Sequence, residues 1–185
     1  MARNYGAKGG KFERDFCRQL SLWWTNQVRD DLFWRTAGSG GRATTRAKSG
    51  KQSAGHAGDI TSTDPSSQPL TDLISFELKR GYNSCTIHDI MDKPRSVVLG
   101  FVEQAKESSH IGGTFSWAVV HKRDAGAALI YVPDDLYRGL CDHGANVIRR
   151  AASVDISDCI LIVARLDDFL EAVTPGCVKA LARVS

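Results

Sequence analysis

The chain has 185 residues, of which 42% are apolar and 24% are charged. This size and balance are typical of one globular domain, and they exclude an intrinsically disordered or collagen-like chain. No apolar run approaches the roughly 18 residues that cross a bilayer, and the first residues lack the apolar segment of a secretory signal. The five cysteines form no Cys-x-x-Cys pair, so we expect reduced thiols inside a cell.

Basic charge is concentrated near the start of the chain. Residues 1–58 contain 11 Lys and Arg against 4 Asp and Glu, a net charge of +7, whereas residues 59–185 contain 13 against 17, a net charge of −4. Clustered Lys and Arg favour a polyanionic partner, because each one that neutralises a phosphate releases condensed counterions. A solvated basic surface without a partner would explain the same composition.

The first predicted element is an amphipathic helix over residues 9–28. Its apolar side chains recur every four residues, at Phe12, Phe16, Leu20 and Trp24. Residues 32–36 are short and aromatic and predict a strand. Residues 36–58 contain six Gly and four Lys or Arg, but no acidic and no large apolar side chain. Such a segment cannot build a core, so we expect a flexible, basic, Gly-rich loop.

After this loop, residues 58–62 and 73–79 predict two strands, which a turn at 64–67 would join into a hairpin. The remaining predicted elements are helices at 95–109, 134–140 and 167–173, strands at 115–120 and 128–132, and an apolar run at 160–163. No Pro- or Ser-rich linker divides the chain. We therefore expect residues 1–185 to form a single α/β domain, in which a central mixed sheet is flanked by helices.

The predicted hairpin contains a group of charged residues. Period-two alternation places Glu77 and Lys79 on the same face of their strand, with Phe76 and Leu78 on the opposite face. If Asp59 is the neighbour across the hairpin, two carboxylates converge, and the Leu78 carbonyl adds a third oxygen ligand for Mg²⁺. The lysine would then lie beside the cation, where it could orient or help to deprotonate a water that attacks a phosphate.

Simpler interpretations of these residues remain open. Glu77 could form an ordinary ion pair with Lys79 or Arg80 at the solvent face of a sheet, where such pairs contribute little. In the helix predicted over residues 9–28, Glu13 would lie in the first turn, on the same helical edge as Cys17. It could point toward the other carboxylates or simply stabilise the helix N-terminus.

Several segments, taken in order, resemble the PD-(D/E)XK nuclease superfamily, and most of all its Holliday junction resolvases from archaea and phages. The matching residues are Gly10-Lys11-Phe12-Glu13-Arg14-Asp15, Arg35, Gly38-Ser39-Gly40, Gly58-Asp59-Ile60 and Phe76-Glu77-Leu78-Lys79. The resemblance covers about residues 9–110. Two features depart from the family pattern. Gly58-Asp59 replaces the common Pro-Asp, and Asp59 lies 18 residues before Glu77, so the insert at 64–71 must form an extended turn.

The resemblance implies a restriction-endonuclease-like core and a Mg²⁺-dependent endodeoxyribonuclease, with Mn²⁺ able to substitute. It implies that Glu13, Asp59, Glu77 and the Leu78 carbonyl bind the metal and that Lys79 assists catalysis. The expected substrate is a four-way junction or other branched DNA, cut to 5′-phosphate and 3′-hydroxyl ends by a homodimer during recombination or repair. The expected location is the cytoplasm of a bacterial, archaeal or phage-infected cell. Residues expected near DNA are Arg35, Ser39, Gly40, Arg42, Arg46, Lys48, Lys51, Arg80 and Gln104.

Other functions compete with junction resolution. A restriction-type nuclease, a recombination exonuclease or a non-catalytic DNA-binding protein could be built on the same fold. Residues 38–43 also satisfy the G-x-G-x-x-A dinucleotide fingerprint, but no apolar helix follows them. The histidines show no ligand-like pairing with cysteine or with one another. We expect Trp23, Trp24 and Trp34 to pack in the core rather than to serve as stacking platforms.

Overall fold

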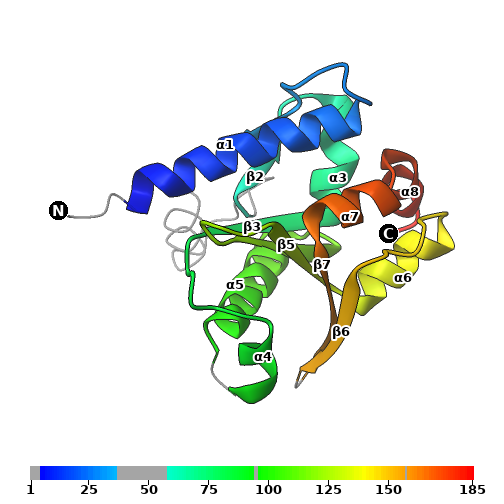
Figure 1. Cartoon of the computed structure of the whole chain (residues 1–185). Helices are drawn as coiled ribbons and strands as arrows, with labels where there is room; N and C mark the ends of the chain where they lie inside the picture. Colours follow the sequence, from blue (N-terminus) through cyan, green and yellow to red (C-terminus); the bar gives the residue numbers. More distant parts are fainter. Residues whose placement is uncertain (1–4, 37–57, 94–95, 157) are drawn as a thin grey trace.

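The computed structural model describes residues 5–36, 58–93, 96–156 and 158–185, with side chains from residue 9 onward (Figure 1). Almost all of the basic loop predicted at 36–58 lies outside these residues. The elements in chain order are α1 Tyr5–Trp24, β1 Phe33–Arg35, β2 Ile60–Ser62, the 3₁₀ turn η1 Pro65–Ser67, α3 Gln68–Leu73, β3 Ile74–Arg80, α4 His88–Asp92, α5 Val97–Gly112, β4 Ser116–Lys122, β5 Ala128–Pro133, α6 Asp134–Asp142, β6 Ala151–Ile156, β7 Cys159–Arg165, α7 Leu166–Ala172 and α8 Pro175–Leu181.

Five strands form a mixed sheet in the order β3-β4-β5-β7-β6. β3 and β4 are parallel, with Lys79 opposite His121, and the other neighbours are antiparallel. α5 lies on the connection between β3 and β4, because parallel strands need a crossover. The predicted α/β fold, with a central mixed sheet and a restriction-endonuclease-like arrangement, is confirmed. Within this sheet β3 is an edge strand, so its free side is open to other parts of the chain.

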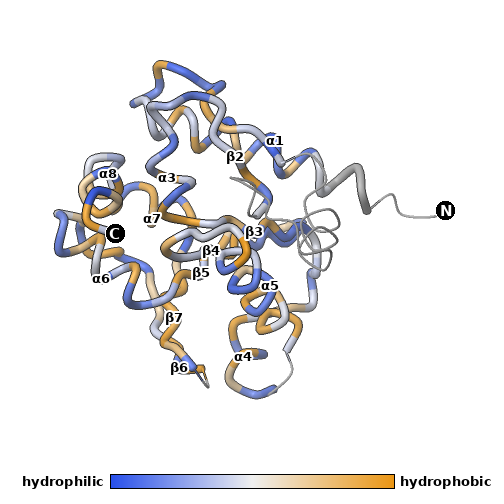
Figure 2. The backbone as a smooth tube through the Cα atoms, turned by 180° about the vertical axis from the view of Figure 1, so that it is seen from behind, coloured by the Kyte–Doolittle hydropathy of each residue, from blue (hydrophilic) through white to orange (hydrophobic). Residues whose placement is uncertain are grey.

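Helices cover both faces of the sheet. One core cluster joins α1, α3, α6, α7 and α8 to the face that carries Phe76 and Leu78, and a second joins α4 and α5 to the face that carries Val119. Figure 1 shows α1 and α7 on one side of β3, and α4 and α5 on the other. Figure 2 shows hydrophobic stretches through the central strands, whereas the turn that follows α1 is largely hydrophilic. Period-two alternation therefore sorts the side chains of β3 between two different environments.

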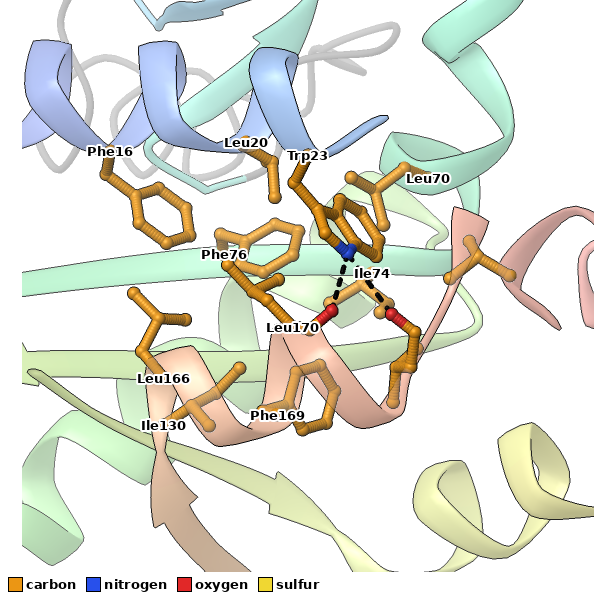
Figure 3. Close-up of a pocket in the computed structure, with 12 residues that line it drawn as sticks. Phe16, Leu20, Trp23, Leu70, Ile74, Phe76, Ile130, Leu166, Phe169 and Leu170 are labelled. Atoms are coloured by element: carbon orange, nitrogen blue, oxygen red, sulfur yellow. Dashed lines mark hydrogen bonds between the residues drawn. The ribbon is translucent and has the colours of Figure 1, made fainter. Parts of the chain in front are cut away.

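The core between α1, β3 and α7 is closely filled. Phe16, Phe76 and Phe169 are among the apolar side chains that surround a cavity of about 10 Å³ (Figure 3). That volume holds at most one water molecule, so the cavity is not a ligand site. Trp23 lies at its edge and donates its indole N–H to the carbonyls of Leu170 at 2.8 Å and Val173 at 3.2 Å. These bonds fix the first helix to the C-terminal part of the chain.

The predicted hairpin of residues 58–62 and 73–79 is wrong. β2 pairs with β1 in an antiparallel ribbon, with Trp34 opposite Thr61, and it forms no ladder with β3. The segment between β2 and β3 is not an extended turn but contains η1 and α3. Pro65 is the first residue of η1 and Pro69 the second residue of α3, and the Asp64 side chain accepts from Ser66 N–H. Proline favours such positions because its fixed φ suits the first turn of a helix.

Sequence patterns also missed several short elements, namely α3, α4, β6 and α8. β6 is an edge strand on which Val154 is the only buried residue, so it shows no clear apolar alternation. Together β6 and β7 complete the sheet, which gives residues 151–165 a structural role that the sequence left undecided. Within the described ranges, none of the helices combines the length and hydropathy that a bilayer-spanning segment needs.

Candidate active site

The site is built on the face of β3 that lies beneath α5. Glu77 and Lys79 share this face, as period-two alternation predicts, and Lys79 Nζ lies 2.5 Å from Glu77 Oε1. Glu77 is only 4% exposed, and the Lys79 side chain is 15% exposed. The alternative of an ion pair on the solvent face of a sheet is therefore wrong, because this pair is buried. Burying two opposite charges is costly unless further contacts compensate for lost hydration.

Two residues of α5 provide such contacts for Lys79. Gln104 Oε1 accepts a hydrogen bond from Lys79 Nζ at 2.8 Å, and the centre of the Phe101 ring lies 5.3 Å from the same atom. The ammonium group thus has a carboxylate, an amide oxygen and an aromatic ring around it. The crossover helix therefore holds the lysine in one position. Gln104, which was predicted to lie near DNA, does face the site, whereas no sequence pattern indicated Phe101.

Asp59 reaches β3 from the loop before β2. Its N–H donates to the Phe76 carbonyl at 2.7 Å, and its Oδ2 accepts from the Leu78 N–H at 2.7 Å. Two hydrogen bonds therefore attach Asp59 to the free side of the edge strand, next to Glu77. The predicted pairing of the two strands is wrong, but Asp59 and Glu77 are neighbours, as the predicted hairpin implied. In a strand the N–H and C=O of one residue point to the same side, so the Leu78 carbonyl also faces the Asp59 side.

Gly58 makes this approach possible. Its φ is +77°, a left-handed backbone conformation that residues other than glycine rarely adopt. A Cβ placed on Gly58 would lie 2.6 Å from the Phe76 carbonyl oxygen and 2.7 Å from Ser75 Oγ. The glycine that replaces the usual proline of the motif is therefore required here by both backbone conformation and space.

Glu13 approaches from α1, where it pairs with Arg35 of β1. Glu13 Oε2 lies 3.5 Å from Arg35 Nη1, and the Glu13 side chain is 19% exposed. Burial raises the pKa of Glu13 and so does the charge of Asp59, whereas Arg35 and Arg14 lower it. Because α1 begins at Tyr5, Glu13 does not lie in its first turn, and the interpretation of Glu13 as a helix-terminal acid is wrong. Glu13 lies instead within electrostatic range of Asp59.

The pKa of Glu77 is strongly raised. Burial, followed by the charge of Asp59, raises the pKa of Glu77 to about 7, although Lys79 acts in the opposite direction. The same carboxylates act on Cys17, where burial, then Glu13 and Asp59, raise the pKa of the thiol to about 12. Cys17 therefore stays protonated and is no nucleophile. A site with more negative charge than its neighbours neutralise is one that a cation would stabilise.

The donor atoms suit a hard divalent cation. Asp59 and Glu77 supply carboxylate oxygens, and the Leu78 carbonyl faces the same side. Ser75 Oγ and Thr36 Oγ1 are buried without hydrogen-bond partners; Ser75 lies against Gly58, and Thr36 N–H bonds to the Asp59 carbonyl. No three His, Cys, Asp or Glu side chains in the described part of the chain are grouped to hold one metal ion. The two carboxylates and the carbonyl oxygen nevertheless fit a divalent ion such as Mg²⁺, which uses one or two carboxylates and keeps several waters.

The residues predicted to lie near DNA fall into three groups. Arg35 and Gln104 are at the site, where they contact Glu13 and Lys79 respectively. Arg80 is largely engaged in structural contacts, because it donates to the Arg123 carbonyl at 3.0 Å and pairs with Asp124 at 3.1 Å. The remaining loop residues lie outside the described residues; these are Ser39, Gly40, Arg42, Arg46, Lys48 and Lys51.

Aromatic residues gave mixed outcomes. Trp24 packs in the core as predicted, and Trp23 is partly buried against it, but Trp34 is 57% exposed, so its assignment to the core is wrong. Trp34 points away from the face of β1 that carries buried Phe33. Sequence patterns also missed Tyr82, which follows β3 and contacts Phe101. A Gly-Tyr-Asn turn directly after the Glu-x-Lys strand is the signal that could have found it.

The sequence of the chain also matches a known protein family. A family model described as "Phage putative PDDEXK endonuclease" matches residues 4–179. The chain belongs to this family. Membership supports a nuclease of the PD-(D/E)XK superfamily, whose members act on DNA and generally use divalent metal ions. Glu77-Leu78-Lys79 matches the E-x-K of that pattern. No match was found among curated proteins or among solved structures.

Proposed function

We propose that the protein is a Mg²⁺-dependent, structure-specific DNA endonuclease, and that its substrate is a four-way junction or a related branched DNA. One observation carries the catalytic part of the proposal. The hydrogen bond from Leu78 N–H to Asp59 Oδ2, at 2.7 Å, brings the motif aspartate beside the buried Glu77–Lys79 pair. Two carboxylates and one ammonium then surround a site that would accept a phosphodiester.

Each residue has a distinct task in this proposal. Asp59, Glu77 and the Leu78 carbonyl would hold the cation, and Mn²⁺ would substitute for Mg²⁺ because it accepts the same oxygen donors. When bound, the cation supplies Lewis-acid stabilisation of the charge that develops on the phosphate. Lys79, fixed by Gln104 and Phe101, would orient the attacking water for in-line displacement, leaving 5′-phosphate and 3′-hydroxyl ends.

Glu13 and Arg35 form the outer part of the site. Their ion pair is loose, at 3.5 Å, and the Arg35 side chain is 38% exposed. An exposed guanidinium beside the site is suited to a DNA phosphate. If Arg35 turns toward such a phosphate, Glu13 is released to support the cation, directly or through a water. The basic segment before Gly58, with Arg42, Arg46, Lys48 and Lys51, would add phosphate contacts that weaken steeply with salt.

A branched substrate and a homodimer complete the proposal. The support for both is the resemblance of the ordered motifs to junction resolvases. Resolving a four-way junction requires two symmetric nicks, and a two-fold dimer provides two equivalent sites. Such an activity would serve recombination or repair of DNA inside the cell. The molar mass of the protein in size-exclusion chromatography, measured with and without junction DNA, tests the dimer independently of cleavage.

A substrate panel tests the proposed function. Purified protein is incubated with a four-way junction, a flap, a linear duplex and a single strand of matched sequence, each with Mg²⁺, Mn²⁺ or EDTA. The proposal predicts paired nicks in the junction with either ion and none in EDTA. Progressive shortening from DNA ends would instead indicate an exonuclease, and cuts at fixed duplex sequences a restriction-type enzyme. Binding of every substrate without cleavage would indicate a non-catalytic DNA-binding protein.

A further inference from the structure

Tyr82 is an exposed aromatic residue at the end of the catalytic strand. It follows β3 directly after Gly81, and 51% of its surface is accessible. Both residues have a left-handed backbone, with φ of +91° at Gly81 and +50° at Tyr82. A bulky residue rarely adopts a positive φ, and such strain persists only where the surrounding structure enforces it. The chain thus holds a large aromatic ring outward at a conformational cost.

Several hydrogen bonds enforce this conformation. Gly81 N–H donates to the Lys122 carbonyl at 3.0 Å, and Cys85 N–H donates to the Tyr82 carbonyl at 2.9 Å. The Gly81 carbonyl lies 3.0 Å from His121 Nε2. Asn83 exchanges two hydrogen bonds with Asp124, at 3.0 and 2.7 Å. The turn is therefore preorganised, and a ligand that uses the ring does not have to order it first.

The Tyr82 ring is also fixed relative to the catalytic lysine. Its centre lies 4.9 Å from that of Phe101, at an interplanar angle of 68°, and the His121 ring lies 6.4 Å away. Phe101 is the same ring that lies 5.3 Å from Lys79 Nζ. A single aromatic ring therefore separates Tyr82 from the ammonium group. An exposed ring so close to the site is placed to meet nucleotides that neighbour the one being cut.

We propose that Tyr82 is a stacking platform for an unpaired base next to the cleaved phosphodiester. This rests on the proposed nuclease function and deepens it, because it identifies the substrate class as DNA with locally unpaired bases. A base inside a duplex has both faces covered by its neighbours, whereas a base in a single strand, flap or open branch point can place one face on a tyrosine ring. Stacking on aromatic side chains tolerates any base, so Tyr82 would select structure rather than sequence.

Binding without cleavage tests this role. Fluorescence anisotropy in EDTA measures the affinity of the full chain for labelled oligo(dT) and for a blunt duplex. We expect Tyr82→Ala to weaken single-strand binding by roughly 5- to 100-fold, the range for loss of one stacked base, with less than about a two-fold change for duplex. Tyr82→Phe and Tyr82→Trp keep a ring and should retain the wild-type preference. Phe115→Ala is the matched control. Phe115 is similarly exposed, at 54%, but it lies just before the start of β4, whereas Tyr82 follows the end of the parallel strand β3.

A second measurement locates the contact. Oligo(dT) carrying one 5-iododeoxyuridine should crosslink to Tyr82 on irradiation, and peptide mapping identifies the residue. The stacking role would be overturned if Tyr82→Ala bound oligo(dT) as tightly as the wild type does. It would also be overturned if this substitution weakened single-strand and duplex binding equally. An equal loss in Phe115→Ala would also overturn it. These assays need no cleavage, so a wild type that fails to cut DNA would refute the nuclease proposal separately.

Discussion

Leu78 donates its backbone N–H to Asp59 Oδ2 at 2.7 Å, across 19 positions of sequence. This bond satisfies an amide on the free side of an edge strand, and it also fixes the acidic group that the site requires. A buried amide left without a partner would be costly. The same interaction therefore contributes to both stability and chemistry, and substitutions of Asp59 can separate the two contributions.

Asp59→Asn should keep the fold, because an amide oxygen can accept the Leu78 N–H, and it removes repulsion from Glu77. Asp59→Ala leaves that N–H unsatisfied and should cost about 1–3 kcal/mol, which lowers Tm by several degrees. Both variants should lose DNA cleavage. Thermal unfolding followed by circular dichroism, with cleavage assays on the same samples, checks this. Equal Tm values for the two variants would show that the hydrogen bond contributes no stability.

Gln104 should act by positioning Lys79. Gln104→Leu removes the acceptor 2.8 Å from Lys79 Nζ, and we expect kcat to fall about 10-fold, as for loss of a hydrogen bond to a charged group. KM should change little, because Lys79 rather than Gln104 meets the substrate. Gln104→Glu keeps an acceptor oxygen and should restore much of the rate. Glu103→Ala, on the exposed side of the same helix, serves as the control. A rate unchanged in Gln104→Leu would contradict the positioning role.

Gly58→Ala should destabilise the protein more than the same change at Gly144. Both glycines have positive φ, +77° and +96°, so both substitutions carry a backbone strain of about 1–2 kcal/mol. Only at Gly58 would the new Cβ also collide with the Phe76 carbonyl, since nothing lies within 4 Å of the one at Gly144. Denaturant unfolding measures the difference. Gly58→Ala should also lose cleavage, because Asp59 is displaced. Equal losses of stability in Gly58→Ala and Gly144→Ala would contradict the close approach of Gly58 to β3.

The stability of the metal-free protein should fall as pH rises, because of Glu77. Burial and the charge of Asp59 raise the pKa of Glu77 to about 7, whereas a glutamate in an unfolded chain titrates near 4.3. Between these values the folded protein binds more protons than the unfolded chain, so this contribution to stability is present below about pH 4.5 and is lost as pH rises through 7.

Glu77→Gln isolates this contribution because its side chain stays neutral. In EDTA at pH 8, calorimetry should show a higher Tm than that of the wild type, which corresponds to a free energy of unfolding larger by on the order of 1–3 kcal/mol. At pH 5 the two Tm values should be similar. The variant retains an oxygen that can accept from Lys79. A Tm below that of the wild type at pH 8 would mean that the ionised carboxylate is net stabilising there.

Local periodicity predicted the part of the site that lies on one strand. Glu77 and Lys79 share a face because alternation in a strand is fixed by backbone geometry, and their burial follows from the apolar helix that covers them. The same reasoning failed for Asp59, because strand pairing depends on contacts between distant segments. β2 pairs with β1 and not with β3, and the connection expected to be a turn contains a 3₁₀ helix that begins at Pro65.

The exposed aromatic residues show a second limit of sequence patterns. Trp34 and Tyr82 look apolar in sequence, but exposure depends on which face of an element meets the rest of the fold. Tyr82 is turned outward by hydrogen bonds to the segment around Lys122 and Asp124, about 40 residues away in sequence. The local Gly-Tyr-Asn pattern indicates a turn at Tyr82, but it does not encode these contacts with a distant segment. The family resemblance likewise could not supply them, because it rested on the acidic motif and the residues around it.

The most direct test of the catalytic centre is the rate of DNA cleavage by the wild type and by Asp59→Asn, measured with Mg²⁺, with Mn²⁺ and with EDTA. The account predicts cleavage by the wild type only when a divalent ion is present, and a rate lower by on the order of 10³-fold in Asp59→Asn, with DNA affinity unchanged. Cleavage by the wild type in EDTA, cleavage by Asp59→Asn at the wild-type rate, or no cleavage of any DNA with either ion would contradict it.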